Sequence, residues 1–260
     1  MILDSIFANR KKQLDILKEK TPTAQIEDEA RRFAQRHETK DFAGALRGGR
    51  LSVIAEVKKA SPSKGLICEN FDPVGIAREY ERSGAAAVSV LTEETYFQGS
   101  ADYLKAIRKE ITLPILRKDF IFDEWQICEA RLISADAVLL IAAMLSESRL
   151  KELLKYARSL SLEALVETHN EREVEAAQRA GAAVFGVNNR NLNDFSVDTG
   201  CACRLSKLLP EGAVFVAESG IKNGNDAKKM REAGADAVLV GEALMTADSI
   251  SQKLDELRAV

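Results

Sequence analysis

The stretch GADAVLVG, residues 234–241, decides the fold because variants of it occur four times along the chain. The other three are GAAAVSVL (84–91), SADAVLLI (134–141) and GAAVFGV (181–187). In each stretch a glycine or serine is suited to end a helix, and small alanines allow a helix and a sheet to approach closely. The apolar run that follows is typical of a buried strand. The repetition therefore predicts helices that alternate with strands.

Four more strands are expected between these runs, at residues 51–57, 113–117, 163–166 and 213–217. Helical periodicity follows the strands at residues 72–83, 103–111, 125–133, 147–160, 171–180, 202–208, 226–233 and 249–257. Strand ends lie roughly 21 to 35 residues apart, the length of one βα unit. Eight such units predict an α/β fold, a (β/α)₈ TIM barrel that forms a single domain over residues 1–260. A doubly wound open sheet is the alternative, but the glycine-rich dinucleotide fingerprint is missing after the first strand.

Residues 1–48 precede the first strand and form an N-terminal helical extension. Its helices are expected to be amphipathic, with Ile2, Ile6, Leu14 and Leu17 on one side and charges on the other. Two roles remain open for this extension. It could cap the bottom of the barrel, or it could form a flap over a substrate.

Composition excludes several classes of function. The formal net charge of −3 provides no basic surface for nucleic acid and no polybasic membrane patch. No apolar run approaches the roughly 20 residues that span a bilayer, and no signal peptide is recognisable, so a cytoplasmic location is expected. The four cysteines are scattered and the two histidines lie far apart, so no metal is expected.

Five apolar runs end in polar residues: VIAEVK (53–58), PILRK (114–118), ALVE (164–167), FGVNNR (185–190) and FVAES (215–219). Ionisable groups at the end of a buried strand are unfavourable unless they are paired or used. Alternation along a strand separates the side chains that face the barrel interior from those that do not, and it sets aside Lys59 and Asn189. The inward set is Glu56, Lys58, Lys118, Glu167, Asn188, Arg190 and Glu218.

This set favours acid–base chemistry. Lysines beside glutamates suit a general acid and a general base, because burial and neighbouring charges shift their pKa values in opposite directions. A desolvated lysine would also suit a Schiff-base enzyme. No serine–histidine or cysteine–histidine pair is available for acyl transfer.

A phosphate site is expected at the last two strands, where Ser219-Gly220 and Gly241-Glu242 each lead into a helix. In barrels, the loops after strands 7 and 8 commonly bind phosphate through backbone N–H groups. The loop ASPSKG, residues 60–65, contains hydroxyls, a cation and a glycine, and it is expected to be an anion-binding lid. A surface loop is the alternative.

Seven ordered motifs together resemble the indole-3-glycerol phosphate synthase family. They are VIAEVKKASPSKG (53–65), LRKDF (116–120), ADAVLLIAAML (135–145), LVETH (165–169), GVNNRNL (186–192), VAESGI (216–221) and VLVGEALM (238–245). The resemblance implies a lyase of tryptophan biosynthesis that closes an indole ring without a cofactor. The implied substrate is a small phosphorylated molecule, 1-(2-carboxyphenylamino)-1-deoxyribulose 5-phosphate, which loses carbon dioxide and water.

The resemblance also implies roles. Lys118 would be the general acid of ring closure and Glu167 the base of dehydration, while Lys58, paired with Glu56, would hold the carboxylate or act as a second acid. Other residues would bind the substrate: Ser61, Leu139, Asn188, Arg190, Glu218 and Ser219 for its sugar and ring, and Gly220, Gly241 and Glu242 for its phosphate. Leu139 and the extension could together form an apolar wall for the anthranilate ring.

Some alternatives and one departure remain. The chain could be another phosphate-binding barrel, such as phosphoribosylanthranilate isomerase or a Schiff-base aldolase, or a barrel that binds a phosphorylated metabolite without turnover. The segment VDTGCACRL, residues 197–205, departs from the family pattern and puts the packing of the next helix in doubt. We expect a monomer or a weak homodimer.

Overall fold

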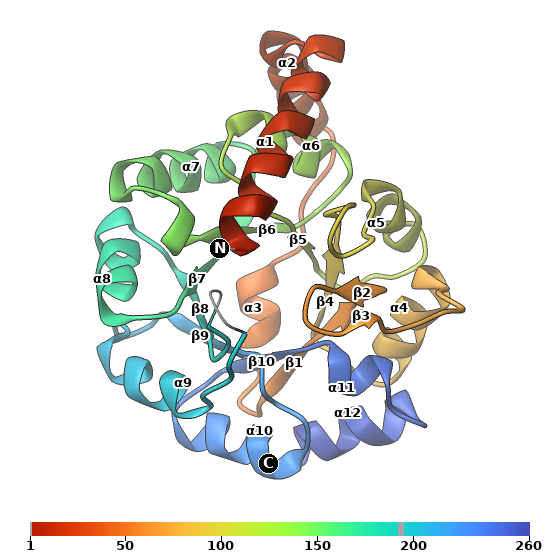
Figure 1. Ribbon diagram of the computed structural model, residues 1–260, viewed down its shortest axis with the longest axis vertical. Coiled ribbons are helices and arrows are strands. Elements are labelled where there is room, and N and C mark those ends of the chain that lie inside the picture. The colour runs from red at the N-terminus through yellow and green to blue at the C-terminus, as the bar shows by residue number, and fades with distance from the viewer. Residues whose placement is uncertain (1, 192–194) are drawn as a thin grey trace.

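Eight parallel strands close into a barrel in the computed structural model, which describes residues 2–191 and 195–260 (Figure 1). Each strand pairs with the next in the chain, and the last pairs with the first. The (β/α)₈ prediction is therefore confirmed and the open sheet is excluded. The strands are β1 (Ser52–Val57), β4 (Ala87–Leu91), β5 (Ile115–Lys118), β6 (Ala137–Ile141), β7 (Glu163–Thr168), β8 (Val184–Asn188), β9 (Val214–Glu218) and β10 (Ala237–Val240).

The outer ring consists of helices that follow the strands (Figure 1). A helix expected at residues 103–111 begins earlier, because Ser100 accepts a hydrogen bond from the N–H of Asp102 and caps it. The helix expected at 202–208 divides into α9 and the 3₁₀ turn η2. The helices are α4 (Pro73–Arg82), α5 (Ala101–Arg108), α6 (Glu124–Leu132), α7 (Glu147–Ser159), α8 (Glu171–Ala180), α9 (Gly200–Leu205), η2 (Ser206–Leu208), α10 (Gly224–Glu232) and α12 (Ile250–Arg258).

Three short features complete the fold, and of these the sequence predicted only the helix after Gly241-Glu242. The strands β2 (Ala60–Ser61) and β3 (Gly65–Leu66) pair as an antiparallel hairpin inside the expected lid loop. A 3₁₀ turn, η1 (Ala142–Met144), follows β6, and a single helical turn, α11 (Glu242–Met245), follows β10. All three lie at the carboxyl ends of strands, where barrels carry their active sites.

The repeated small-residue stretches end helices as predicted. Their first residues have positive φ angles of 81° at Gly84, 65° at Ser134, 86° at Gly181 and 92° at Gly234. This left-handed conformation ends a helix, and glycine adopts it with the least strain.

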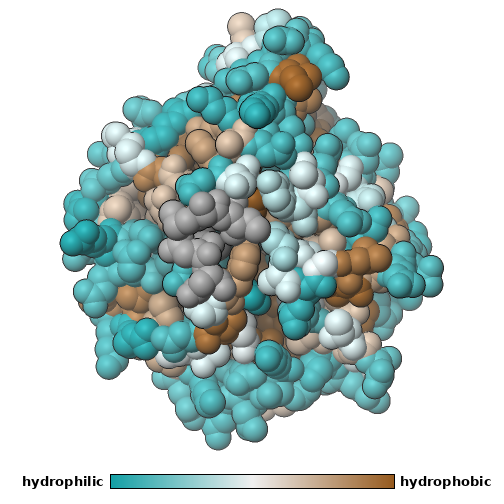
Figure 2. All heavy atoms as spheres, in the orientation of Figure 1, coloured by the Kyte–Doolittle hydropathy of each residue, from teal (hydrophilic) through white to brown (hydrophobic). Residues whose placement is uncertain are grey.

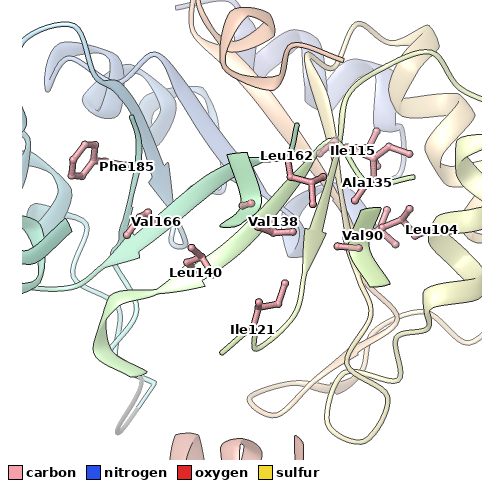
Figure 3. Packing of buried hydrophobic residues seen from close by; sticks show 14 of the residues in the cluster. Val90, Leu104, Ile115, Ile121, Ala135, Val138, Leu140, Leu162, Val166 and Phe185 are labelled. Carbon is pink, nitrogen blue, oxygen red and sulfur yellow. The ribbon is translucent and has the colours of Figure 1, made fainter. Parts of the chain in front are cut away.

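The core has two layers, which alternate along each strand. Leu139 and Ile141 of β6 point into the barrel interior, while Val138 and Leu140 point outward toward the helices. Figure 3 shows part of this outer layer, with Val138 and Leu140 among apolar side chains from neighbouring strands. The outward surface of the helices is mainly hydrophilic (Figure 2). No helix in the described part of the chain has the length and apolar character to cross a membrane.

The N-terminal extension contains α1 (Ile2–Lys20), α2 (Thr23–Ala34) and α3 (Phe42–Leu46), and it contacts both ends of the barrel. At the bottom, Phe42 and Leu46 of α3 are fully buried in the interior cluster, beside the first residues of several strands. At the top, Asn9 of α1 donates to the hydroxyl of Thr95 in the loop after β4.

The cap at the bottom of the barrel is therefore formed by α3, whereas the flap over a substrate stays a prediction. The segment between α1 and α3 passes along the side of the barrel, where α2 packs against α6 and the indole of Trp125 donates to the carbonyl of Thr21. The side chain of Ile2 lies outside the described residues, whereas Ile6 and Leu14 are buried.

Candidate active site

A cavity of about 1090 Å³ opens at the carboxyl ends of the strands. All thirteen site residues predicted from the sequence line it, and the two residues that strand alternation sets aside, Lys59 and Asn189, do not. Its size fits a small-molecule ligand. The predicted set is Glu56, Lys58, Ser61, Lys118, Leu139, Glu167, Asn188, Arg190, Glu218, Ser219, Gly220, Gly241 and Glu242.

Lys118, the last residue of β5, lies between two carboxylates. Its Nζ is 3.4 Å from Oε2 of Glu167 on β7 and 3.5 Å from Oε2 of Glu218 on β9. Burial lowers the pKa of Lys118, but the carboxylates of Glu167, Glu218 and Glu56 raise it further, so the net shift is upward. The side chain is therefore an ammonium group at neutral pH.

The two carboxylates beside Lys118 differ in protonation. Burial favours the neutral form of Glu167, but Lys118 and His169 hold its pKa well below the usual range. Burial, together with the charge of Glu167, raises the pKa of Glu218 to about 8 against the opposing effect of Lys118. Oε1 of Glu218 is buried and has no hydrogen-bond partner within the described structure. The site thus presents one ionised carboxylate and one carboxyl group that is mainly protonated at neutral pH.

Lys58 and Glu56 form a second pair at the end of β1, with 2.6 Å between Nζ and Oε1. Burial raises the pKa of Glu56, but Lys58 and Lys118 outweigh it and the net shift is downward. Gly241 lies beside this pair. A Cβ atom at position 241 would be 2.6 Å from Oε1 of Glu56, so only glycine leaves the pair undisturbed.

Gly186 on β8 makes room for Glu218 in the same way. A Cβ atom at position 186 would lie 2.1 Å from Oε1 of Glu218. This glycine belongs to the motif GVNNRNL, but the need for a glycine there comes from Glu218 on the neighbouring strand. Alternation would orient residue 186 toward the interior, so a glycine there is the signal that something else fills the space.

Two asparagines on successive residues perform different tasks. Asn188 lines the cavity, and its Oδ1 accepts a hydrogen bond from the N–H of Arg190 while its side chain also bonds Glu167. Asn189 is buried on the opposite side of the strand, where its Oδ1 accepts from the N–H of Ala202 in α9. That contact anchors the helix whose packing the sequence left in doubt. Leu192, the last residue of the GVNNRNL motif, lies outside the described residues.

The expected phosphate loops border the cavity. Ser219 and Gly220 both have positive φ angles, of 65° and 78°, which turn the chain sharply after β9. Gly241 and Glu242 follow β10. The β2–β3 hairpin approaches this side through Lys64, whose Nζ is 3.2 Å from Oε1 of Glu242.

The apolar wall of the cavity differs in part from the prediction. Leu139 contributes to it as expected, but none of the described residues of the extension lines the cavity. Its other members include Leu91, Phe97, Phe120 and Ile141, which come from the strands and from the loops after β4 and β5.

A second charged cluster, which the sequence reasoning missed, surrounds Arg117 on the other face of β5 and Asp119, the residue after this strand, which also borders the cavity. Asp119 accepts two hydrogen bonds from Arg10 of α1, at 3.1 and 2.8 Å, and one at 3.1 Å from Arg117. It also accepts from the hydroxyl of Thr92, and Arg117 bonds Glu129. Alternation in LRKDF could have indicated this cluster, because it places two charges on a face that is buried.

Residues 3–257 match the family model described as indole-3-glycerol phosphate synthase. The chain belongs to this family. Curated proteins named indole-3-glycerol phosphate synthase match most or all of the chain. The protein from Acetivibrio thermocellus is 49% identical over 263 residues, covering 100% of both chains. The protein from Desulfotalea psychrophila is 53% identical over 207 residues, covering 80% of each.

Membership of the indole-3-glycerol phosphate synthase family makes the chain a carboxy-lyase of tryptophan biosynthesis. Two solved structures share only the fold. A thiamine phosphate pyrophosphorylase from Pyrococcus furiosus superposes with a TM-score of 0.62 at 19% identity, over 82% of this chain and 96% of that one. A 3-hexulose-6-phosphate synthase superposes with a TM-score of 0.64 at 16% identity, over 80% and 99%.

Proposed function

We propose that the chain converts 1-(2-carboxyphenylamino)-1-deoxy-D-ribulose 5-phosphate to indole-3-glycerol phosphate, with loss of carbon dioxide and water. The observation that carries this proposal is the position of Lys118 on the cavity floor, 3.4 Å from Glu167 and 3.5 Å from Glu218. An ammonium group and an ionised carboxylate at one point supply the acid and the base that ring closure and dehydration need.

In the first step Lys118 acts as the acid. The ring carbon that bears the carboxylate attacks the ribulose carbonyl, and the developing alkoxide takes a proton from Nζ. A buried ammonium with a raised pKa transfers its proton to a strong base such as an alkoxide, and the adjacent carboxylates stabilise it before the reaction. Loss of carbon dioxide then restores the aromatic ring.

In the last step the hydroxyl formed from the carbonyl takes a proton from an ammonium group of the site, Lys58 or a reprotonated Lys118, and leaves as water. Glu167, held ionised by Lys118, removes the proton from the carbon next to nitrogen. Lys58 holds the substrate carboxylate or acts as a second acid, and its contact with Glu56 fixes it at the cavity edge. Each of these groups borders the same cavity, so no side chain must move far between steps.

The remaining lining residues divide the substrate between them. The phosphate binds at the loops of Ser219-Gly220 and Gly241-Glu242 in this proposal, and Ser61 of the hairpin lines the same cavity. Asn188, Arg190 and Glu218 bind the sugar hydroxyls and the aromatic carboxylate. Leu139 and its apolar neighbours enclose the ring.

The test is incubation of the purified chain with the carboxyphenylamino-deoxyribulose phosphate while indole fluorescence is recorded. Fluorescence should rise with enzyme concentration, and the absence of product at micromolar enzyme would refute the proposal. A parallel incubation with borohydride tests for a Schiff-base aldolase. A stable adduct at Lys118 would refute the acid role, whereas the ammonium state of Lys118 leads us to expect none.

A further inference from the structure

His169 contacts Glu167 at the carboxylate oxygen that does not face Lys118. Its Nε2 lies 3.3 Å from Oε1 of Glu167, while Lys118 faces the other oxygen, Oε2, at 3.4 Å. The two carboxylate oxygens therefore have separate partners. His169 is not among the described residues that line the cavity.

The imidazole is itself held in place by the next helix. Its Nδ1 lies 3.1 Å from Oε2 of Glu173 in the first turn of α8, and the same oxygen accepts the backbone N–H of His169 at 2.8 Å. Glu173 is fixed in turn, because its N–H donates to Oδ1 of Asn170 and Nδ2 of Asn170 donates to its Oε1. Asn170 is the N-cap of α8, so these bonds anchor the imidazole to the start of that helix.

We infer that His169 is a positioning residue for Glu167, holding Oε1 so that Oε2 faces Lys118 and the substrate. The inference rests on the proposed function, in which Glu167 is the base of dehydration. A carboxylate with one oxygen fixed cannot rotate freely, and a base must lie within hydrogen-bond reach of the proton that it removes.

His169 makes one contact more than is needed to hold β7 against α8. Asn170 and the backbone N–H of His169 already satisfy Glu173, so fastening alone does not require the ring to contact Glu167. Nε2 has no hydrogen bond apart from its ion-pair contact at 3.3 Å with Glu167 within the described structure. The ring thus connects Glu173, which holds the start of α8, to Glu167, the proposed base.

The charged groups around His169 come from four elements. Glu167 lies on β7, Glu173 on α8, Glu218 on β9 and Lys118 on β5, and the thiol of Cys201 on α9 donates to the carbonyl of His169. Burial lowers the pKa of His169, but bonds to the first two carboxylates raise it to about 10. The ring is therefore an imidazolium at neutral pH, and its charge helps to keep Glu167 ionised.

A first test uses the histidine NMR signals of the free enzyme and does not depend on activity. The chain has only two histidines, so a variant with His37 replaced by Gln assigns both. His169 should remain protonated to pH 9, and Glu167→Gln should lower its apparent pKa by about one unit or more, because one attracting charge is lost. Titration of His169 near its ordinary value of about 6.5 in both proteins would overturn the inference.

A second test uses kinetics. His169→Gln should lower kcat by about 10-fold or more while KM changes by less than about 2-fold, because the residue orients the base without contacting the substrate. The acid limb of the kcat profile should also move to higher pH, since the charge that lowers the pKa of Glu167 is gone. The control is His37→Gln at an exposed site, which should change neither quantity. An unchanged kcat and an unchanged limb in His169→Gln would overturn the inference.

The two hypotheses fail in different ways. If the unsubstituted chain makes no indole, the proposed function is refuted, and the NMR coupling still decides whether His169 senses Glu167. If turnover is normal and His169→Gln matches the unsubstituted chain, only the positioning role is refuted. If His169→Gln does not fold, Glu173→Gln is the second variant, because it keeps the backbone bond from residue 173 to Asn170. It should lower both the pKa of His169 and kcat. If the pKa and kcat both stay unchanged, the positioning role of His169 is refuted.

Discussion

The two faces of β5 carry buried charges that differ in how completely they are paired. On the outer face, Asp119 and Arg117 belong to a cluster with Arg10, Thr92 and Glu129, in which hydrogen bonds of 2.6 to 3.1 Å connect the charged groups. On the inner face, Lys118 contacts its carboxylates at 3.4 and 3.5 Å.

This difference separates charges that stabilise the fold from charges that are available to a ligand. Burial would raise the pKa of Asp119, but Arg10 and Arg117 lower it, and every neighbour is a fixed partner. In the inner cluster one oxygen of Glu218 has no partner within the described structure, and its pKa is raised to about 8. Incomplete pairing leaves hydrogen-bonding capacity for a substrate, which a saturated network lacks.

The largest expected effect is the loss of turnover in Lys118→Met. We expect kcat to fall by about 10⁴-fold, the upper range for a general acid, while substrate binding changes by only a few fold. The free energy of unfolding should also fall, because the buried carboxylates of Glu167 and Glu56 lose a cation that lowers their pKa. Steady-state kinetics and urea denaturation measure both. Lys59→Met, whose side chain lies outside the cavity, is the matched control, and a kcat within 10-fold of normal in Lys118→Met would assign the acid elsewhere.

The outer cluster should lose stability but keep turnover. Asp119→Asn removes the charge shared by Arg10 and Arg117, and breaking such a buried pair lowers the free energy of unfolding by about 3 kcal/mol or more. At a temperature where the variant is folded, kcat should stay within about 10-fold of normal. A fall in kcat like that of Lys118→Met, without loss of stability, would contradict the division between the two faces.

Glu167→Gln should lower kcat by about 10²-fold, since it removes the base of dehydration. Glu129→Gln is the control from the outer cluster, because it replaces a carboxylate of the same size that also contacts a β5 cation. We expect this control to retain kcat within about 2-fold. Equal losses in both variants would mean that the inner carboxylate has no special role.

A pH effect follows from Glu218. Its pKa is about 8 in the folded chain and about 4.3 when unfolded, so the folded state binds the extra proton between these values. The contribution of Glu218 to stability is therefore fully present below about pH 4 and declines as pH rises toward 8, by at most about 1.4 kcal/mol per unit.

Glu218→Gln removes this decline. Urea denaturation at pH 5, 6, 7 and 8 should show the difference in unfolding free energy shifting steadily in favour of the variant. A difference that is constant across this range would indicate that Glu218 is ionised throughout, like its neighbour Glu167.

The smallest effect is expected for an exposed pair. Lys64 contacts Glu242 at 3.2 Å, but their side chains are 55% and 39% exposed. Lys64→Ala should change stability by less than about 0.5 kcal/mol, because solvent screens such pairs. Since the side chain borders the phosphate loops, KM should rise by a few fold at low ionic strength. A loss of stability as large as that of Asp119→Asn would show that burial is not what distinguishes the clusters.

The sequence was sufficient for the fold and for the inner cluster. Helix ends at Gly84 and Ser134, followed by apolar runs, identified the βα units, and strand alternation separated Lys118 from its neighbours. Both inferences depend on residues close together in the chain, where local geometry decides the outcome.

The outer cluster and the positioning contacts needed the structure. Arg10 and Asp119 are 109 residues apart, and no spacing rule connects them. Gly186 and Gly241 take their meaning from carboxylates on adjacent strands. The contact of His169 with Glu167 depends on a ring orientation that α8 imposes.

The N-terminal extension also affects the order in which parts of the chain can fold during synthesis. α3 is synthesised before the strands, yet the interior cluster that buries it includes Val214 and Ala237, which are synthesised about 170 to 195 residues later. Phe42 and Leu46 therefore have no complete pocket until β10 closes the ring. During translation α3 is therefore made early and docks late. Until it docks, these two apolar side chains are exposed and available to a chaperone.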